Sequence, residues 1–173
     1  RIYMKKVVLV DGNNLLFRSY YATAYQGNFM KNKAGFPTNA LYGFINMINK
    51  IINEEKPQYM LVAFDKGKTF RHDKYKDYKA GRIEMPNELK QQFPVAKEIL
   101  THLGIKWFEI ENYEADDIVG TLSKMIDEEN DYEGLIVSSD KDLLQLISDK
   151  VIMKMLKPKD YVIMNKKTFF DIY

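Results

Sequence analysis

Short apolar runs rich in β-branched residues alternate along the chain with segments of helical periodicity. Four runs predict strands, at residues 7–10, 59–64, 106–110 and 135–137. The clearest helix follows Thr38, which can cap it, and carries apolar residues at i+3 and i+4 spacing. Strands that alternate with helices predict a three-layer α/β/α fold around a mainly parallel sheet.

The carboxyl-terminal third departs from this alternation. Residues 151–164 alternate around a turn at 157–160, which predicts a hairpin at the sheet edge. A helix is expected from about Pro86 to Leu103, where Pro94 must kink or restart it and Gly104 ends it. Other helices are expected to begin near Tyr113, Asp140 and Thr168.

Composition narrows the class of protein. The 173 residues are 46% hydrophobic and 29% charged, which suits a single folded domain over residues 1–173. The absence of cysteine excludes a disulfide scaffold, a thiolate nucleophile and a Cys-based zinc site, and two histidines exclude a His-rich metal site. No segment resembles a membrane span or a secretion signal, so we expect a soluble cytoplasmic protein. Nothing in the sequence suggests an obligate oligomer, so we expect a monomer.

Charge is strongly segregated although the net charge is only +2. Residues 66–82 carry seven basic side chains against Asp73 and Asp77, whereas residues 109–133 carry ten acidic side chains against Lys124. Each block alone is typical of a solvated face. A basic segment that faces an acidic pocket indicates instead a polyanion together with metal ions.

Seven carboxylates are predicted to converge at one edge of the sheet. In open parallel sheets, ligands bind at the carboxyl ends of the strands, near the point where the strand order reverses. Four acidic residues lie at or near the ends of strands, and three further acidic residues open the helix that follows the third strand. These seven candidate metal ligands are Asp11, Asp65, Glu114, Asp116, Asp117, Asp140 and Asp142.

So many anions in one pocket require bound cations or strongly raised pKa values. Oxygen ligands without His or Cys suit Mg²⁺ or Mn²⁺, and two such ions about 4 Å apart are suited to phosphodiester hydrolysis. The basic stretch starts at the same edge, so Arg71, Lys79 and Arg82 are candidates to hold the scissile phosphate. Tyr75 and Tyr78 are candidates to stack on unpaired bases. The sequence therefore predicts metal-dependent hydrolysis of nucleic acid.

Each segment alone also has a simpler explanation. Asp11-Gly12 fits a strand-ending turn, the acids near residue 116 fit a helix dipole, and Ser139 with Asp142 fits a capping box. The basic stretch alone fits a solvated loop. We favour the site hypothesis because it explains all four segments together.

Four motifs in this order resemble the 5′-nuclease domain of bacterial DNA polymerase I, in the flap-endonuclease-like, PIN-related superfamily. The resemblance covers essentially the whole chain. The motifs are Val7-Val8-Leu9-Val10-Asp11-Gly12-Asn13-Asn14, Val62-Ala63-Phe64-Asp65 with Phe70 to Arg82, Tyr113-Glu114-Ala115-Asp116-Asp117-Ile118, and Ser139-Asp140-Lys141-Asp142-Leu143.

The resemblance implies a 5′-3′ exonuclease and flap endonuclease of bacterial DNA replication and repair, associated with the nucleoid. It implies one metal ion held by Asp11, Asp65, Glu114 and Asp116, and a second held by Asp140 and Asp142, with Asp117 in the cluster. Lys79 matches a phosphate-steering lysine of an arch over the 5′ strand, and Phe17 matches a base-stacking aromatic. The residues expected to contact DNA are Phe17, Arg18, Lys68, Arg71, Lys74, Tyr75, Lys76, Tyr78, Lys79 and Arg82.

The resemblance also implies that relatives continue into further carboxylates, a helix–hairpin–helix element and, in some, a polymerase. We expect this chain to be truncated before them. The alternatives are a nucleic-acid-binding module with an incomplete catalytic site, a PIN-type ribonuclease, or a phospho-receiver domain. The number of acids and the basic segment argue against the phospho-receiver domain.

Overall fold

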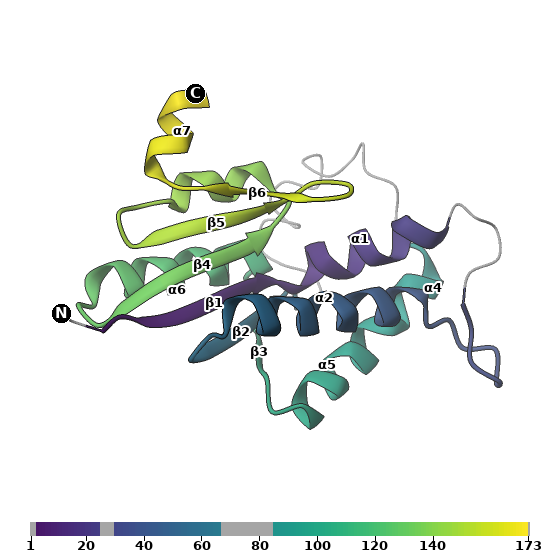
Figure 1. Cartoon of the computed structure of the whole chain (residues 1–173). Helices are drawn as coiled ribbons and strands as arrows, with labels where there is room; N and C mark the ends of the chain where they lie inside the picture. The colour runs from purple at the N-terminus through teal and green to yellow at the C-terminus, as the bar shows by residue number, and fades with distance from the viewer. Residues whose placement is uncertain (1–2, 25–29, 67–84, 173) are drawn as a thin grey trace.

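The structure, a computed structural model, describes residues 3–24, 30–66 and 85–172 (Figure 1). Its centre is a six-stranded sheet in the order β3-β2-β1-β4-β5-β6. The pairings from β3 through β5 are all parallel, and β6 pairs antiparallel with β5. The strands are β1 (Lys5–Asp11), β2 (Tyr59–Phe64), β3 (Lys106–Glu109), β4 (Tyr132–Ser138), β5 (Val151–Leu156) and β6 (Tyr161–Met164).

Helices cover both faces of this sheet (Figure 1). One face carries α1 (Gly12–Ala24), α2 (Asn39–Glu55), α4 (Asn87–Lys90) and α5 (Gln92–His102), and the other carries α6 (Ala115–Glu128) and the 3₁₀ helix η1 (Lys141–Leu146). Alternate residues of β1 explain this, because Val8 and Val10 pack with the first group and Val7 and Leu9 with the second. The predicted three-layer α/β/α fold is confirmed.

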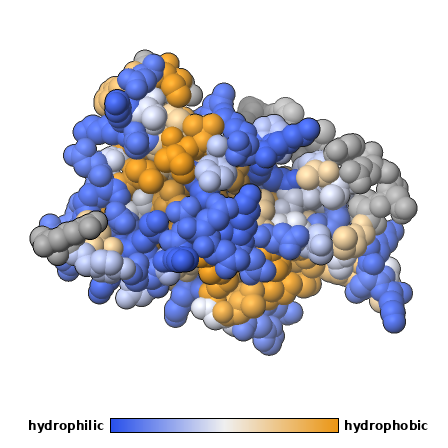
Figure 2. All heavy atoms as spheres, viewed as in Figure 1, coloured by the Kyte–Doolittle hydropathy of each residue, from blue (hydrophilic) through white to orange (hydrophobic). Residues whose placement is uncertain are grey.

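Apolar side chains also remain exposed near the end of the chain. Figure 2 shows them gathered where β6 leads into α7 (Lys166–Ile172), and they include Val162, Ile163, Phe170 and Ile172. Within the described ranges, no helix combines the length and apolar character that crossing a membrane requires.

Several local predictions are confirmed. The edge hairpin forms from β5 and β6. The helix expected to be interrupted by Pro94 is two helices separated at Gln91, with Pro94 in the first turn of α5, where a missing N–H costs little. Gly104 follows this helix with a φ of +75°, a conformation that glycine adopts without strain.

Other local predictions differ from the structure in detail. A helix does begin near Asp140, but it is a 3₁₀ helix, and its cap is Asp140, whose carboxylate accepts the Asp142 N–H at 2.9 Å. The Ser139 hydroxyl bonds to Asn14 instead, so the proposed capping box does not form. Thr38 occupies the cap position of α2 but makes no side-chain capping bond. At Ser139 a long-range bond has replaced the expected local one.

The strand order reverses at β1. The chain proceeds from β1 to β2 and β3 on one side, and then crosses to β4 and β5 on the other. A helix begins directly at the end of β1, where Gly12 approaches the neighbouring strand closely. A Cβ at this position would lie 2.6 Å from Phe64 Cε1 and 2.8 Å from the Ala63 carbonyl oxygen. The start of α1 is therefore fixed against β2 at the reversal point.

We predict that Gly12→Ala destabilises the fold by about 1–3 kcal/mol, because backbone and a buried ring surround the added methyl group. Gly120→Ala is the matched control. It lies inside α6 with its nearest neighbour, Leu146, at 3.8 Å, so it should leave stability unchanged or raise it by up to about 1 kcal/mol. Urea denaturation measures both, and equal effects would contradict the close approach.

Candidate active site

The carboxyl ends of three adjacent strands place acidic side chains together. Asp11 is the last residue of β1, Asp65 follows β2 directly, and Asp140 follows the end of β4 by two residues. The register aligns these ends, since Asp11 pairs with Ala63 of β2 and Val10 pairs with Val137 of β4. The three side chains meet at the strand-order reversal, as expected from the sequence.

Asp11 is the most deeply placed of these acids, with 6% of its surface exposed. Its carboxylate accepts hydrogen bonds from the Ser138 hydroxyl at 3.0 Å and from the Asn14 N–H at 3.2 Å. The pKa of Asp11 is raised to about 7, mainly because the carboxyl is buried; the two hydrogen bonds oppose the rise, and the nearby charges of Asp65 and Asp140 add to it. A bound cation would favour its charged form.

Asp65 is tied to two other elements. Its carboxylate accepts the Ala115 N–H at 2.6 Å, at the first turn of α6. The Asn13 side-chain amide donates to the same carboxylate at 3.1 Å and accepts the Asp65 N–H at 2.9 Å. The positive end of the α6 dipole thus partly offsets the charge of Asp65.

Three further acids open α6. Glu114 is the buried N-cap residue and forms a capping box with Asp117, whose carboxylate accepts the Glu114 N–H at 2.9 Å. Glu114, Asp116 and Asp117 each offer an oxygen within 4.8 Å of the others, the spacing of a possible metal site. The same three residues therefore open a helix and have the spacing of a possible metal site, so the two explanations do not exclude each other.

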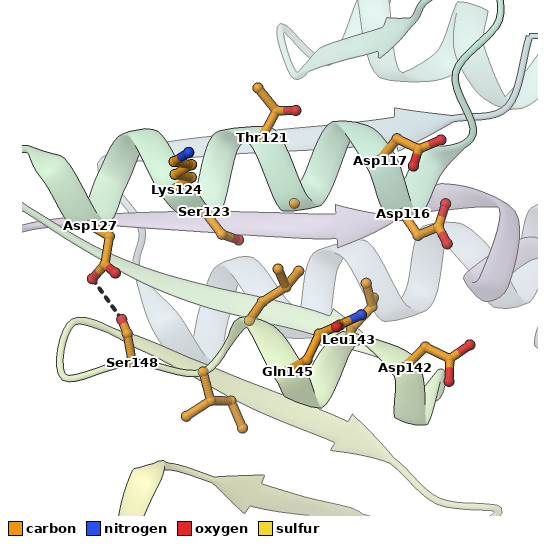
Figure 3. Close-up of a pocket in the computed structure, with 13 residues that line it drawn as sticks. Asp116, Asp117, Thr121, Ser123, Lys124, Asp127, Asp142, Leu143, Gln145 and Ser148 are labelled. Atoms are coloured by element: carbon orange, nitrogen blue, oxygen red, sulfur yellow. Dashed lines mark hydrogen bonds between the residues drawn. The ribbon is translucent and has the colours of Figure 1, made fainter.

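Asp142 completes the acidic edge. It is exposed, and it lies across a groove of about 640 Å³ from Asp116 and Asp117, between η1 and α6 (Figure 3). Figure 3 shows the three carboxylates at the same end of that groove, while a bond of 2.7 Å between Ser148 and Asp127 joins its walls at the other end. The structure thus gathers the seven predicted acids along one edge.

The predicted DNA contacts are only partly described. Phe17 is half-buried on α1, stacked on Tyr21 with ring centroids 6.3 Å apart and edge-on to Phe93. Arg18 donates to the Lys157 carbonyl at 2.8 Å, which links α1 to the β5–β6 turn. Their contacts with DNA stay predictions. The other candidates, Lys68, Arg71, Lys74, Tyr75, Lys76, Tyr78, Lys79 and Arg82, lie outside the described residues.

Two asparagines at this edge were not singled out from the sequence. Asn13 bonds to Asp65, and Asn14 bonds to Ser139 in the loop after β4. The signal for them was their place in the first motif, as two polar residues directly after the Asp11-Gly12 strand end.

Residues 6–173 match the family model described as the 5′-3′ exonuclease, N-terminal resolvase-like domain. The chain belongs to this family. It is 45% identical over 154 residues to DNA polymerase I of Streptococcus pneumoniae, an alignment that covers 88% of this chain and 17% of the relative. It is 41% identical over 169 residues to a 5′-3′ exonuclease of Bacillus subtilis, and this alignment covers 96% of this chain and 56% of the relative.

The fold of this 5′-3′ exonuclease family member also resembles solved structures. The bacteriophage T5 D15 flap endonuclease, solved as a pseudo-enzyme–product complex with DNA and metal ions, matches with a TM-score of 0.67 at 22% identity, over 97% of this chain and 60% of that one. The expected resemblance and the PIN-like fold are confirmed. The chain spans only part of each of these proteins.

The pKa of Asp11 predicts how the stability of this family member depends on pH. The pKa of Asp11 is about 7 in the folded chain against an ordinary value of 3.8. Between about pH 4 and pH 7, therefore, the folded chain keeps a proton on Asp11 that the unfolded chain has released. Stability should therefore fall as pH rises from about 4 to 7, by up to about 4 kcal/mol, and the loss should then level off.

Asp11→Asn should remove this contribution. In urea denaturation with EDTA, the free energy of unfolding should fall more from pH 5 to pH 8 for the wild-type chain than for the variant. The same stability difference between the two proteins at both pH values would contradict the raised pKa.

Proposed function

We propose that this chain is the catalytic part of a 5′-3′ exonuclease and flap endonuclease. It would hydrolyse phosphodiester bonds at the 5′ ends and flaps of DNA, using two divalent cations such as Mg²⁺ or Mn²⁺. The observation that carries the proposal is the convergence of carboxylates from four separate segments at the strand-order reversal.

The described side chains fit such cations. The donors at this edge are carboxylate oxygens, which hard divalent cations prefer. A buried Asp11 with a pKa of about 7 is poorly stabilised as an anion by protein groups alone. Asp11, Asp65, Glu114 and Asp116 would hold one ion, and Asp140 and Asp142 the second, with Asp117 beside them.

When bound, two such ions supply an acidified water and offset the charge that develops on the phosphoryl and leaving oxygens. The chain's own residues would prepare the site. Asp11 would give up its proton when a cation binds, and α6 would hold Glu114 and Asp65 through its first turn. Arg71, Lys79 and Arg82 are proposed to hold the scissile phosphate.

DNA is the proposed substrate because the family is described as a 5′-3′ exonuclease, one relative is a DNA polymerase, and the T5 flap endonuclease was solved with DNA. The relatives comprise DNA polymerase I proteins and a separate exonuclease, so a polymerase domain in the same polypeptide is proposed by analogy with the first group. We also propose that the protein acts in the cytoplasm, at the nucleoid.

Replacing a ligand carboxylate should abolish the reaction. We predict that Asp65→Asn and Asp116→Asn each slow cleavage of a 5′-labelled flap DNA by about a hundredfold or more in Mg²⁺ or Mn²⁺, because each loses several kcal/mol of charge stabilisation. Asp171→Asn, an exposed acid on α7, is the matched control and should cleave at the wild-type rate.

Other results separate the alternatives. Wild-type rates for both site variants would contradict the assignment. Salt-sensitive DNA binding without cleavage by the wild-type chain would favour a nucleic-acid-binding module. Faster cleavage of a matched RNA would favour a PIN-type ribonuclease.

A further inference from the structure

We propose that Asn13 and Asn14 are positioning residues that set the spacing of the carboxylates on either side of β1. The proposal rests on the proposed function, because it concerns how the same acidic edge is shaped for divalent cations. Neither side chain is an anion, and each bonds to a different neighbouring strand end.

Asn13 fixes the acid on the β2 side. Its amide nitrogen donates to Asp65 Oδ2 at 3.1 Å, and its amide oxygen accepts the Asp65 backbone N–H at 2.9 Å. The pair therefore defines both the backbone position and the carboxylate orientation of Asp65. The other carboxylate oxygen bonds to the Ala115 N–H at 2.6 Å, so one carboxylate is held from two sides.

Asn14 fixes the loop on the β4 side. The Asn14 amide oxygen accepts the Ser139 N–H at 2.9 Å. The Ser139 hydroxyl lies 3.0 Å from the same amide oxygen and 2.7 Å from the Asn14 amide nitrogen. Ser139 directly precedes Asp140, whose carboxylate accepts the Asp142 N–H. Asn14 thus anchors the residue from which both acids of that loop follow.

The two asparagines act from one rigid element. They occupy consecutive positions in the first turn of α1, where successive side chains point about 100° apart. One therefore reaches β2 while the other reaches β4. The same turn is fixed to β1 by the Asn14 N–H bond to Asp11 and to β2 by the close approach of Gly12. Together these bonds set the separation between Asp65, Asp11 and Asp140.

Residues that hydrogen-bond to metal ligands affect metal affinity although they do not touch the metal themselves. Removing a group that orients a ligand typically weakens metal binding by about 10–100-fold. Neutral amides suit this role because they orient carboxylates without adding charge to an edge that already repels itself.

The test is calorimetric titration of the metal-stripped chain with Mn²⁺ at pH 8, where Asp11 is mostly ionised. We expect Asn13→Ala and Asn14→Ala each to weaken Mn²⁺ binding by about 10–100-fold. Asn46→Ala, an exposed asparagine on α2, is the matched control and should bind as the wild type does. Asp65→Asn should remove the tightest binding.

A double-variant cycle separates positioning from a general structural role. Ser139→Ala deletes one hydroxyl and keeps the Ser139 N–H, so it should fold and weaken binding less than Asn14→Ala. Adding it to Asn14→Ala should cause no further loss, because the hydroxyl's partner is already gone. Melting temperatures in EDTA report any loss of folding.

Four results would overturn the proposal. If Asp65→Asn loses Mn²⁺ but both asparagine variants bind normally, positioning fails and the proposed function stands. If the wild-type chain binds no Mn²⁺, the proposed function fails and positioning fails with it. If weaker binding only follows the fraction unfolded in EDTA, or the Asn14 and Ser139 effects simply add, the asparagines have a structural role alone.

Discussion

Repulsion among carboxylates at the carboxyl edge of the sheet is the constraint on which the rest of the structure depends. Asp11 is buried and lies near Asp65 and Asp140, and its pKa of about 7 reflects the unfavourable setting of its anion. Metal-free protein reduces this repulsion by several means. Asp11 can hold a proton, the first turn of α6 donates to Asp65, and a capping box holds Glu114 and Asp117. These means orient the acids while leaving them available to cations.

Sheet topology creates the crowding in the first place. Because the strand order reverses at β1, the carboxyl ends of β1, β2 and β4 all lie near one point, and α6, which packs on the opposite face of the sheet from α1, begins there as well. The core on both faces fixes the strand register through alternate side chains of β1. Apolar packing on both faces of the sheet thus holds the strand ends, and with them the cluster of carboxylates, in place.

The sequence predicted the features that local patterns encode. Buried parallel strands are continuous apolar runs, so residues 7–10 and 59–64 were evident, and an acid directly after each run located the site. The roles of Asn13 and Asn14 were not predictable in this way. Their bonding partners, Asp65 and Ser139, lie 52 and 125 residues away, and such long-range bonds leave no periodic signal. All of the basic segment except Lys66 lies outside the described residues, so its part in the site stays a prediction.

The most direct test of the central claim is the number of protons released when Mn²⁺ binds, obtained from titrations in two buffers of different ionisation enthalpy. At pH 6 the metal-free chain holds a proton on Asp11, and binding requires the carboxylate. The account predicts release of close to one proton at pH 6 and almost none at pH 8.5. Binding with the same proton release at both pH values, or no binding at all, would contradict it.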